Sequence, residues 1–146
     1  MSEPQNARGF DEVDYRRVID PMTQQELLVP HEISDDRAIE QARKQRAGEL
    51  RVIRFFLDWG HNYPLWESFT GKYAMEPSDY DLSPELGQRL LEWSQFWQRH
   101  FDPFDDWDEQ ENEDTWLTRG HELVRLLEVE VYDIAVIWPQ FGPSRM

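Results

Sequence analysis

Asp58 and His61 lie three residues apart in the segment LDWGHNYPLW, directly after an apolar run. A carboxylate beside an imidazole is a common pairing for acid–base chemistry, and loops that follow a strand often carry functional residues. Tyr80 follows in the same long connection and is a third polar candidate. A small enzyme or ligand-binding protein that uses the loop after residue 59 would therefore depend on these three side chains. The simpler interpretation is that Asp58 marks the end of a strand, which assigns no catalytic residue.

A second candidate is the run FDPFDDWDEQENEDTW, residues 101–116, which holds eight carboxylates and no basic residue. Such a run suits a metal loop, an imitation of nucleic acid, or the first turn of a helix. The calcium-binding EF-hand pattern fails, because counting from Asp106 the sixth residue is Glu111 instead of glycine and the twelfth is Leu117. We therefore interpret the run as a helix start whose acids stay on the surface and bind a partner. The acids are Asp102, Asp105, Asp106, Asp108, Glu109, Glu111, Glu113 and Asp114.

The remaining chemistry-bearing residues predict no cofactor and no metal site. The chain has four histidines without a shared ligand spacing and no cysteine, so the usual zinc patterns are missing. It also has no G-x-S-x-G motif and no glycine-rich phosphate loop. We therefore expect a non-enzymatic protein.

The charge of the chain narrows the class of partner. The formal net charge is −15, and residues 61–146 carry 18 acids against 6 bases. A surface this negative repels phosphate backbones, which disfavours direct binding of nucleic acid. It suits a protein partner with a basic surface. We expect a protein-interaction module that binds such a partner through its acidic face, and an immunity or antitoxin protein is one concrete form of this function.

Composition sets the class and the compartment. A chain of 146 residues fits one domain, and the seven Trp, eight Phe and five Tyr supply large apolar areas for a core. No apolar run approaches the ~18 residues of a membrane helix, and the polar N-terminus has no apolar signal core. The sequence therefore favours the cytoplasm, with no membrane contact.

The first third of the chain predicts a tail, a hairpin and a helix. Residues 1–12 have the composition of a flexible tail, and residues 13–146 form one domain. Within it, residues 13–19 and 26–29 predict two short strands around the turn signal Asp20-Pro21. Ser34 then caps a helix that Gly48 ends. Residues 13–49 thus precede an α+β core at residues 50–138.

Two strands and two helices make up that core. The alternation of apolar residues predicts a strand at residues 51–59, and a helix that continues through the run is the alternative. The segment LSPELGQRLLEWSQFW predicts a helix at residues 83–101, with Ser83 as its cap. A closing strand is predicted at residues 129–137. The fold class is α+β, a small β-sheet with two or three helices on one face, and the N-terminal hairpin is expected to complete the sheet.

The second core helix explains the acidic run. The segment DEQE has the form of a capping box, with Asp108 as the cap and Glu111 three residues later. The acids that follow lie at the positive end of a helix running to about Leu127. Gly120 within it allows another element to approach closely.

Three segments together resemble a known set of proteins: IRFFLDWGHNYPLWE, DYDLSPELGQRLLEWSQFWQRHFDPFDDWD and the pattern W…GHELVRLLEVEV. In this pattern Asp-aromatic-Gly, Pro-Leu-Trp and a Leu-Ser-Pro-Glu-Leu helix follow one another, and the chain is similar here to small acidic actinobacterial proteins of unassigned function. The resemblance covers about residues 50–137. The resemblance implies an α+β fold and a bacterial source with a GC-rich genome. It identifies no catalytic residue in this sequence.

Overall fold

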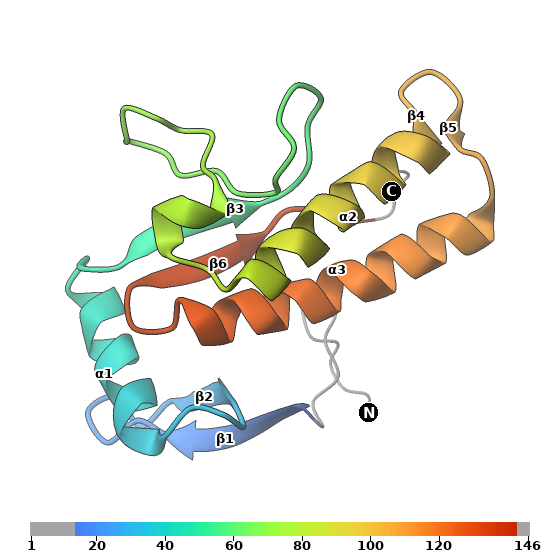
Figure 1. Ribbon diagram of the computed structural model, residues 1–146. Coiled ribbons are helices and arrows are strands. Elements are labelled where there is room, and N and C mark those ends of the chain that lie inside the picture. The colour runs from blue at the N-terminus through green and yellow to red at the C-terminus, as the bar shows by residue number, and fades with distance from the viewer. Residues whose placement is uncertain (1–13, 143–146) are drawn as a thin grey trace.

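Two parallel strands and two long helices form the centre of the structure, a computed structural model that describes residues 14–142. Strand β3 (Arg51–Phe55) pairs in parallel with β6 (Ala135–Pro139), so that Ile53 lies opposite Ile137. Between these strands the chain forms the short 3-10 helix η2 (Pro77–Tyr80) and the helices α2 (Pro84–His100) and α3 (Gln110–Glu130). Both long helices lie on one face of the strand pair (Figure 1). The predicted α+β class, with helices on one face of a small sheet, is therefore confirmed.

The N-terminal segment forms a separate layer. Strands β1 (Tyr15–Ile19) and β2 (Glu26–Pro30) make an antiparallel hairpin, and helix α1 (Asp35–Arg46) follows. The Oγ atom of Ser34 accepts a hydrogen bond from the Arg37 backbone N–H, which confirms the predicted cap. The hairpin and the helix are thus confirmed, whereas the predicted tail at residues 1–12 lies outside the described residues.

The expectation that this hairpin completes the central sheet is wrong. The described strands form three separate two-stranded sheets, β1–β2, β3–β6 and β4–β5. Val18 and Val29 pack in their own apolar cluster with Tyr132, at the end of α3. The hydroxyl of Tyr15 also donates to the Glu128 carboxylate of α3 over 3.0 Å. The hairpin therefore attaches to the helix layer through side chains instead of extending the sheet through its backbone.

Both predicted core strands have different bounds in the structure. β3 ends at Phe55, four residues early, and the closing strand begins at Ala135, because α3 extends to Glu130. Leu127 and Val131 are 0% and 1% exposed and continue the buried stripe of the helix by one turn. The two valines within residues 129–131 therefore lie at the end of the helix and in the turn that follows it. The prediction of a strand from residue 129 is wrong.

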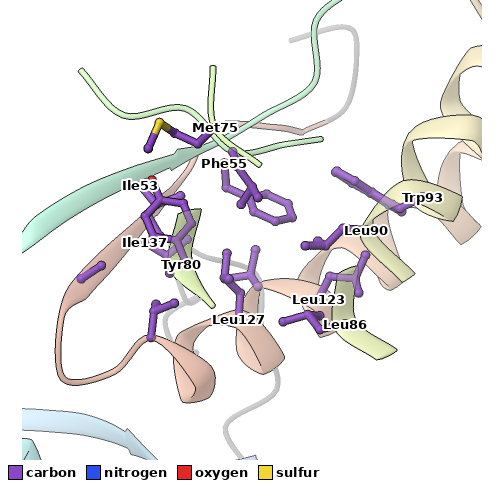
Figure 2. Close-up of a cluster of buried hydrophobic side chains, with 14 of the residues drawn as sticks. Ile53, Phe55, Met75, Tyr80, Leu86, Leu90, Trp93, Leu123, Leu127 and Ile137 are labelled. Carbon is purple, nitrogen blue, oxygen red and sulfur yellow. The ribbon is translucent and has the colours of Figure 1, made fainter. Parts of the chain in front are cut away.

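The main core lies between the strand pair and the two helices (Figure 2). Leu90 and Trp93 of α2 meet Phe55 of β3 and Leu127 of α3, all of them buried. The rings of Phe55 and Trp93 lie 5.2 Å apart between centroids. Each such side chain stabilises the fold by roughly 1.5–3 kcal/mol relative to an exposed position, so this cluster supplies much of the stability of the domain.

At Gly120 the helix α2 packs closely against the backbone of α3. A Cβ atom built on Gly120 would lie 2.6 Å from Cζ2 of Trp93 and 2.7 Å from Cε2 of Phe141. These distances are shorter than any ordinary van der Waals contact. The indole of Trp93 stacks on Trp116, with ring centroids 4.5 Å apart and planes 2° from parallel. The close approach expected at Gly120 is therefore confirmed, and it leaves no room for a side chain.

We expect Gly120→Ala to destabilise the protein by about 1–3 kcal/mol, because the added methyl group must displace packed rings. Gly87→Ala is the matched control, since a Cβ there would meet Pro77 at an ordinary 3.5 Å. That change should raise stability by up to ~1 kcal/mol through the higher helix propensity of alanine. Urea denaturation measures both changes. Equal effects of the two substitutions would contradict the packing at Gly120.

Candidate partner-binding surface

The acidic run forms a hairpin and the start of a helix at one end of the molecule. β4 (Phe101–Asp102) and β5 (Asp106–Trp107) pair antiparallel, and α3 begins at Gln110. We call residues 102–114 the acidic turn. Figure 1 shows β4 and β5 at the end of the α2–α3 pair that lies away from α1, β1 and β2. The turn is closed by Asp102, whose Oδ1 accepts from the backbone N–H groups of Phe104 (2.7 Å) and Asp105 (3.2 Å).

Asp108 does not cap α3, so the predicted capping box is wrong. Glu109 holds the N-cap position, and its side chain makes no capping hydrogen bond. The Asp108 carboxylate instead lies 2.8 Å from Nδ1 of His100, at the end of α2, and accepts from Nδ2 of Asn112 over 2.9 Å. The hydrogen bond from Asn112 lowers the pKa of Asp108 below its usual value most, and the contact with His100 lowers it further. Asp108 therefore ties the two helices together across the turn.

Most of the predicted surface acids are exposed. Asp106 is half-buried, with its backbone at φ 70°, and Glu113 is only 3% exposed. Oε1 of Glu113 lies 3.4 Å from the Nε2 atom of Gln110. The expectation that Glu113 stays on the surface is therefore wrong, because the first turn of α3 directs this side chain inward. The exposed acids are Asp102, Asp105, Asp108, Glu109, Glu111 and Asp114.

An apolar cavity, which we call the aromatic hollow, adjoins the acidic turn. Its volume is about 230 Å³. Phe101 and Trp107 lie opposite each other in the β4–β5 pair, with ring centroids 5.6 Å apart, and Trp97 stacks on Phe101. The hollow is lined by Phe56, Leu57, Trp97, Phe101, Trp107, Trp116, Gln140, Phe141 and Gly142. Sequence reasoning placed tryptophans in the core but had no signal for this hollow, because its lining comes from five separate segments.

The structure gives Asp58, His61 and Tyr80 three different environments. Asp58 is exposed, and its Oδ1 accepts from the backbone N–H of the next residue, Trp59. Nε2 of His61 lies 2.8 Å from the Met75 carbonyl oxygen. Tyr80 is buried at 4% exposure. The described hydrogen bonds join none of the three to another, so the structure assembles no acid–base site from them.

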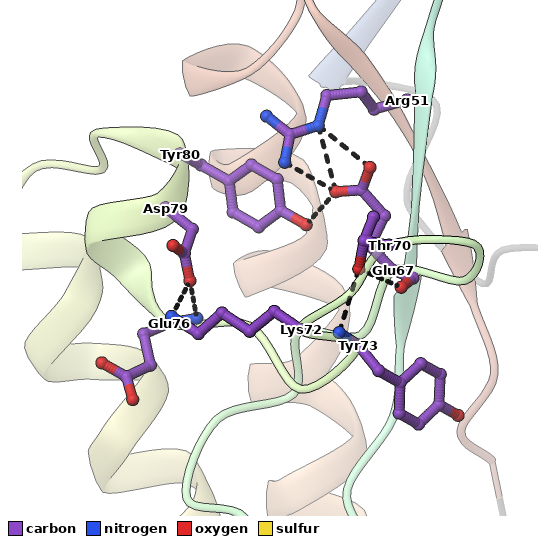
Figure 3. Close-up of polar contacts among 8 residues, drawn as sticks. All are labelled: Arg51, Glu67, Thr70, Lys72, Tyr73, Glu76, Asp79 and Tyr80. Atoms are coloured by element: carbon purple, nitrogen blue, oxygen red, sulfur yellow. Dashed lines mark hydrogen bonds and ion pairs between the residues drawn. The ribbon is translucent and has the colours of Figure 1, made fainter.

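Tyr80 belongs to a polar network with Glu67, which is buried, and Arg51, whose side chain is 39% exposed (Figure 3). Glu67 is 7% exposed, and its Oε1 accepts from the Tyr80 hydroxyl over 2.7 Å. Nε of Arg51 donates to both oxygens of that carboxylate at 3.0 Å. Burial, and then the hydrogen bond to Glu67, raise the pKa of Tyr80 above its usual value. The phenol therefore stays neutral and anchors the connection between β3 and α2 to β3.

Sequence reasoning missed Glu67. A signal for it existed, because Glu67 is the one acid within the apolar stretch YPLWESF, and an acid that becomes buried needs a cationic partner. Arg51 fills this role from the first position of β3.

Two kinds of feature are missing from the described part of the chain. Among residues 14–142, no group of three or more His, Asp or Glu side chains is placed to hold a metal ion. In the same range no helix is long and apolar enough to cross a membrane.

Comparison with known families bears on the region from β3 to β6. A sequence model of the Serratia CdiI immunity protein-like family matches residues 51–138. The chain belongs to this family. The matched region includes α2, the acidic turn and α3, and it leaves out β1, β2 and α1. It nearly coincides with residues 50–137, where the sequence resembles the small acidic proteins named above. No match was found among curated proteins.

Membership of an immunity protein family implies a protein partner, a toxin that the family member binds and neutralises. The expectation of a protein-interaction module is therefore supported at this level. The membership does not say which surface meets the toxin.

The Arg51–Glu67 pair should matter more to stability than exposed ion pairs do. We expect Arg51→Met to destabilise the protein by about 3 kcal/mol, because it leaves the Glu67 carboxylate buried without its cation. Arg89→Met, which removes the exposed Arg89–Glu122 pair, should cost at most ~1 kcal/mol. Chemical denaturation measures both. If the two variants lost the same stability, the network would not anchor the connection.

Asp108 should make stability depend on pH. Its pKa is lowered in the folded state, so its contribution is complete above the unfolded pKa of about 3.9 and is lost as the pH falls through the folded pKa. Asp108→Asn should therefore lower the melting temperature near pH 7, and the difference from the wild type should shrink as the pH falls below ~4.

Asp105→Asn is the control for this pH series, because Asp105 lies in the same turn and its side chain accepts no described hydrogen bond. Its effect on the melting temperature should be small at every pH. If the difference in melting temperature between Asp108→Asn and the wild type stayed the same at every pH, protonation of the Asp108 carboxylate would not be coupled to folding.

Proposed function

We propose that this protein is an immunity protein that binds a CdiA toxin domain through the acidic turn and thereby neutralises it. The main support for this proposal is the distribution of ion pairs in the structure. Outside the turn many carboxylates are paired with arginine or lysine, as in the pairs Asp20–Arg46, Glu32–Arg125 and Asp79–Lys72. The unpaired acids there, such as Asp36, Asp81 and Glu85, do not follow one another along the chain as those of the turn do. The negative charge outside the acidic turn is thus partly neutralised within the fold.

The acidic turn has no such compensation. Asp102, Asp105, Glu109, Glu111 and Asp114 form no ion pair with any residue that the structure describes. The ion pair described in the turn joins Asp108 to a histidine, and residues 101–116 contain no lysine or arginine. These carboxylates remain available to a partner, and the chemical complement of such a surface is a basic patch on the toxin.

Electrostatic complementarity of this kind acts mainly on the rate of association. Opposite charges on two proteins steer the encounter and raise the association rate constant, and salt weakens the effect over a screening length of ~10 Å at 0.1 M. A rigid presentation of the charges favours binding further, because less conformational entropy is lost. The Asp102 and Asp108 hydrogen bonds supply this rigidity to the turn.

The toxin itself is identified by affinity capture from the native host at low salt. Co-expression of the captured toxin domain with this protein should then restore growth of cells that the toxin alone arrests. Growth arrest despite co-expression would contradict the neutralising role, and a failure to capture any partner at low salt would count against the acidic surface.

The triple variant Asp105→Asn, Glu109→Gln, Glu111→Gln tests the acidic turn directly. We expect its association rate constant with the toxin domain to fall about tenfold at low ionic strength, with a smaller change in the dissociation rate. Stopped-flow measurements at low and high salt give both rates, and the defect should shrink as salt increases.

The matched control removes three exposed acids far from the turn, by Asp36→Asn, Asp81→Asn and Glu85→Gln. Asp81 lies in a turn and Glu85 lies in the first turn of α2, so the local settings and the change in net charge correspond. This control should leave the association rate within about twofold of the wild type. Equal slowing by both triple variants would mean that net charge alone, and no particular surface, attracts the toxin.

A further inference from the structure

A groove of about 570 Å³ lies between β6 and the layer formed by β2 and α1 (Figure 1). We call it the β6 groove. Leu27 and Leu28 of β2, Ala42 of α1 and Tyr132 after α3 give it apolar walls. Its lining includes no residue of the acidic turn. The β6 groove is therefore a second candidate surface, separate from the one proposed for the toxin.

One wall of this groove is the open edge of β6. The other edge of β6 pairs in parallel with β3, where the Gln140 N–H donates to the Phe55 carbonyl oxygen over 2.8 Å. In a parallel ladder the backbone groups of alternate residues turn to the same edge, so those of residues 136, 138 and 140 face β3. The backbone groups that point away from β3 are those of Ala135, Ile137 and Pro139.

These outward groups are one half of a β ladder without its partner. The Ala135 N–H donates to the Val131 carbonyl oxygen over 3.0 Å, and Pro139 has no N–H. One donor, the Ile137 N–H, and the carbonyl oxygens of all three residues remain. In the part of the chain that the structure describes, these four groups have no hydrogen-bond partner. Such a row of alternating backbone groups is the template for another strand.

The opposite edge of the sheet offers no such template. There the backbones of Arg54 and Trp66 exchange two hydrogen bonds, over 2.8 and 3.2 Å. The loop that follows β3 thus covers the edge of β3, and β6 keeps the open edge. Its five residues rise about 3.3 Å each, so the edge is long enough for a strand of about five residues.

The side chains around the groove favour an uncharged occupant. The charged residues described in its lining are two acids, and both already have partners. Glu26 forms an ion pair with Arg17 over 2.6 Å, and Glu128 accepts from the Tyr15 hydroxyl over 3.0 Å. Because successive side chains of a strand point to opposite faces, an occupant would place every second side chain against the apolar walls.

We infer that the β6 groove binds an extended segment of a partner protein that has an apolar residue at every second position. The segment adds to β6 as a third strand of the central sheet. Backbone hydrogen bonds to β6 supply affinity, and the apolar walls select the side chains. The inference goes beyond the proposed function, because it assigns a second interaction surface that does not depend on the acidic turn.

The test is an NMR titration of the full-length protein with acetyl-Gly-Thr-Val-Thr-Val-Thr-Gly-amide. We expect saturable shifts of the Trp138 indole signal, since Trp138 lines the groove and is 52% exposed. Hydrogen exchange of the Ile137 amide should slow about tenfold or more at saturation, because the peptide accepts its hydrogen bond. The amides of residues 136 and 138, which face β3, are the internal controls and should change little.

Two N-methylated versions of the peptide separate pairing along the edge from apolar contact alone. One carries methyl groups on the valine nitrogens and the other on the threonine nitrogens. Only alternate N–H groups of a strand face β6. One version should therefore bind at least about tenfold more weakly than the parent peptide, and the other should stay within about threefold of it.

A pair of substitutions in α1 places the site. Ala42→Gln puts a longer side chain into the groove and should weaken binding about fivefold or more. Ala47→Gln is the matched control, because Ala47 is exposed at the end of the same helix and does not line the groove. It should bind as the wild type does. The N-methylated peptides test the inference on the unmodified protein, so it stays decidable even if Ala42→Gln fails to fold.

Several results would overturn the inference. These are no saturable change with the parent peptide, undiminished binding of both N-methylated versions, or Trp138 shifts without protection of the Ile137 amide. Protection of that amide in the free protein would also do so: if it rises with protein concentration, a second copy occupies the edge, and if it is constant, the chain itself covers it. The triple acid variant decides the proposed function separately, since its three substitutions lie outside the groove.

Discussion

The contact between α2 and α3 at Gly120 is the constraint on which the rest of the structure depends. With no side chain at this position, the ring of Trp93 lies against the backbone of α3, where a methyl group would overlap it. Trp93 also donates from Nε1 to the Trp116 carbonyl oxygen over 2.8 Å, which fixes the rotation of one helix relative to the other. This close contact determines where the far ends of both helices lie, and therefore where the β4–β5 hairpin is held.

That placement explains how a highly charged segment can be rigid. Eight carboxylates within residues 101–116 repel one another, yet the hairpin is tied by Asp102 to its own turn and by Asp108 to both helices. Phe101 and Trp107 pack toward the core side of the same hairpin. The repulsion is thus opposed by packing on one side and by hydrogen bonds within the turn, while the acids on the other side remain exposed.

The residues that stabilise the fold and the proposed recognition surface occupy different parts of the molecule. The network of Arg51, Glu67 and Tyr80 secures the long connection after β3, and the residues that first suggested catalysis belong to this connection. The surface with uncompensated charge lies at the opposite end of the α2–α3 pair (Figure 1). If the acidic turn binds the toxin as proposed, this separation is favourable, because that surface can change to follow a toxin without loss of the core.

The sequence by itself determined the features that depend on near neighbours. The caps at Ser34 and Ser83, the buried stripe of α2, the hairpin at β1–β2 and the concentration of acids at 102–114 all follow from spacings of two to four residues. Tertiary structure decided the rest: that Glu113 turns inward, that Asp108 binds His100, that α3 continues to Glu130, and that Glu67 meets Arg51. The aromatic hollow likewise forms only when segments around Phe56, Trp97, Trp107, Trp116 and Phe141 come together. The physical reason is that burial depends on which distant element covers a side chain, and local spacing carries no information about that element.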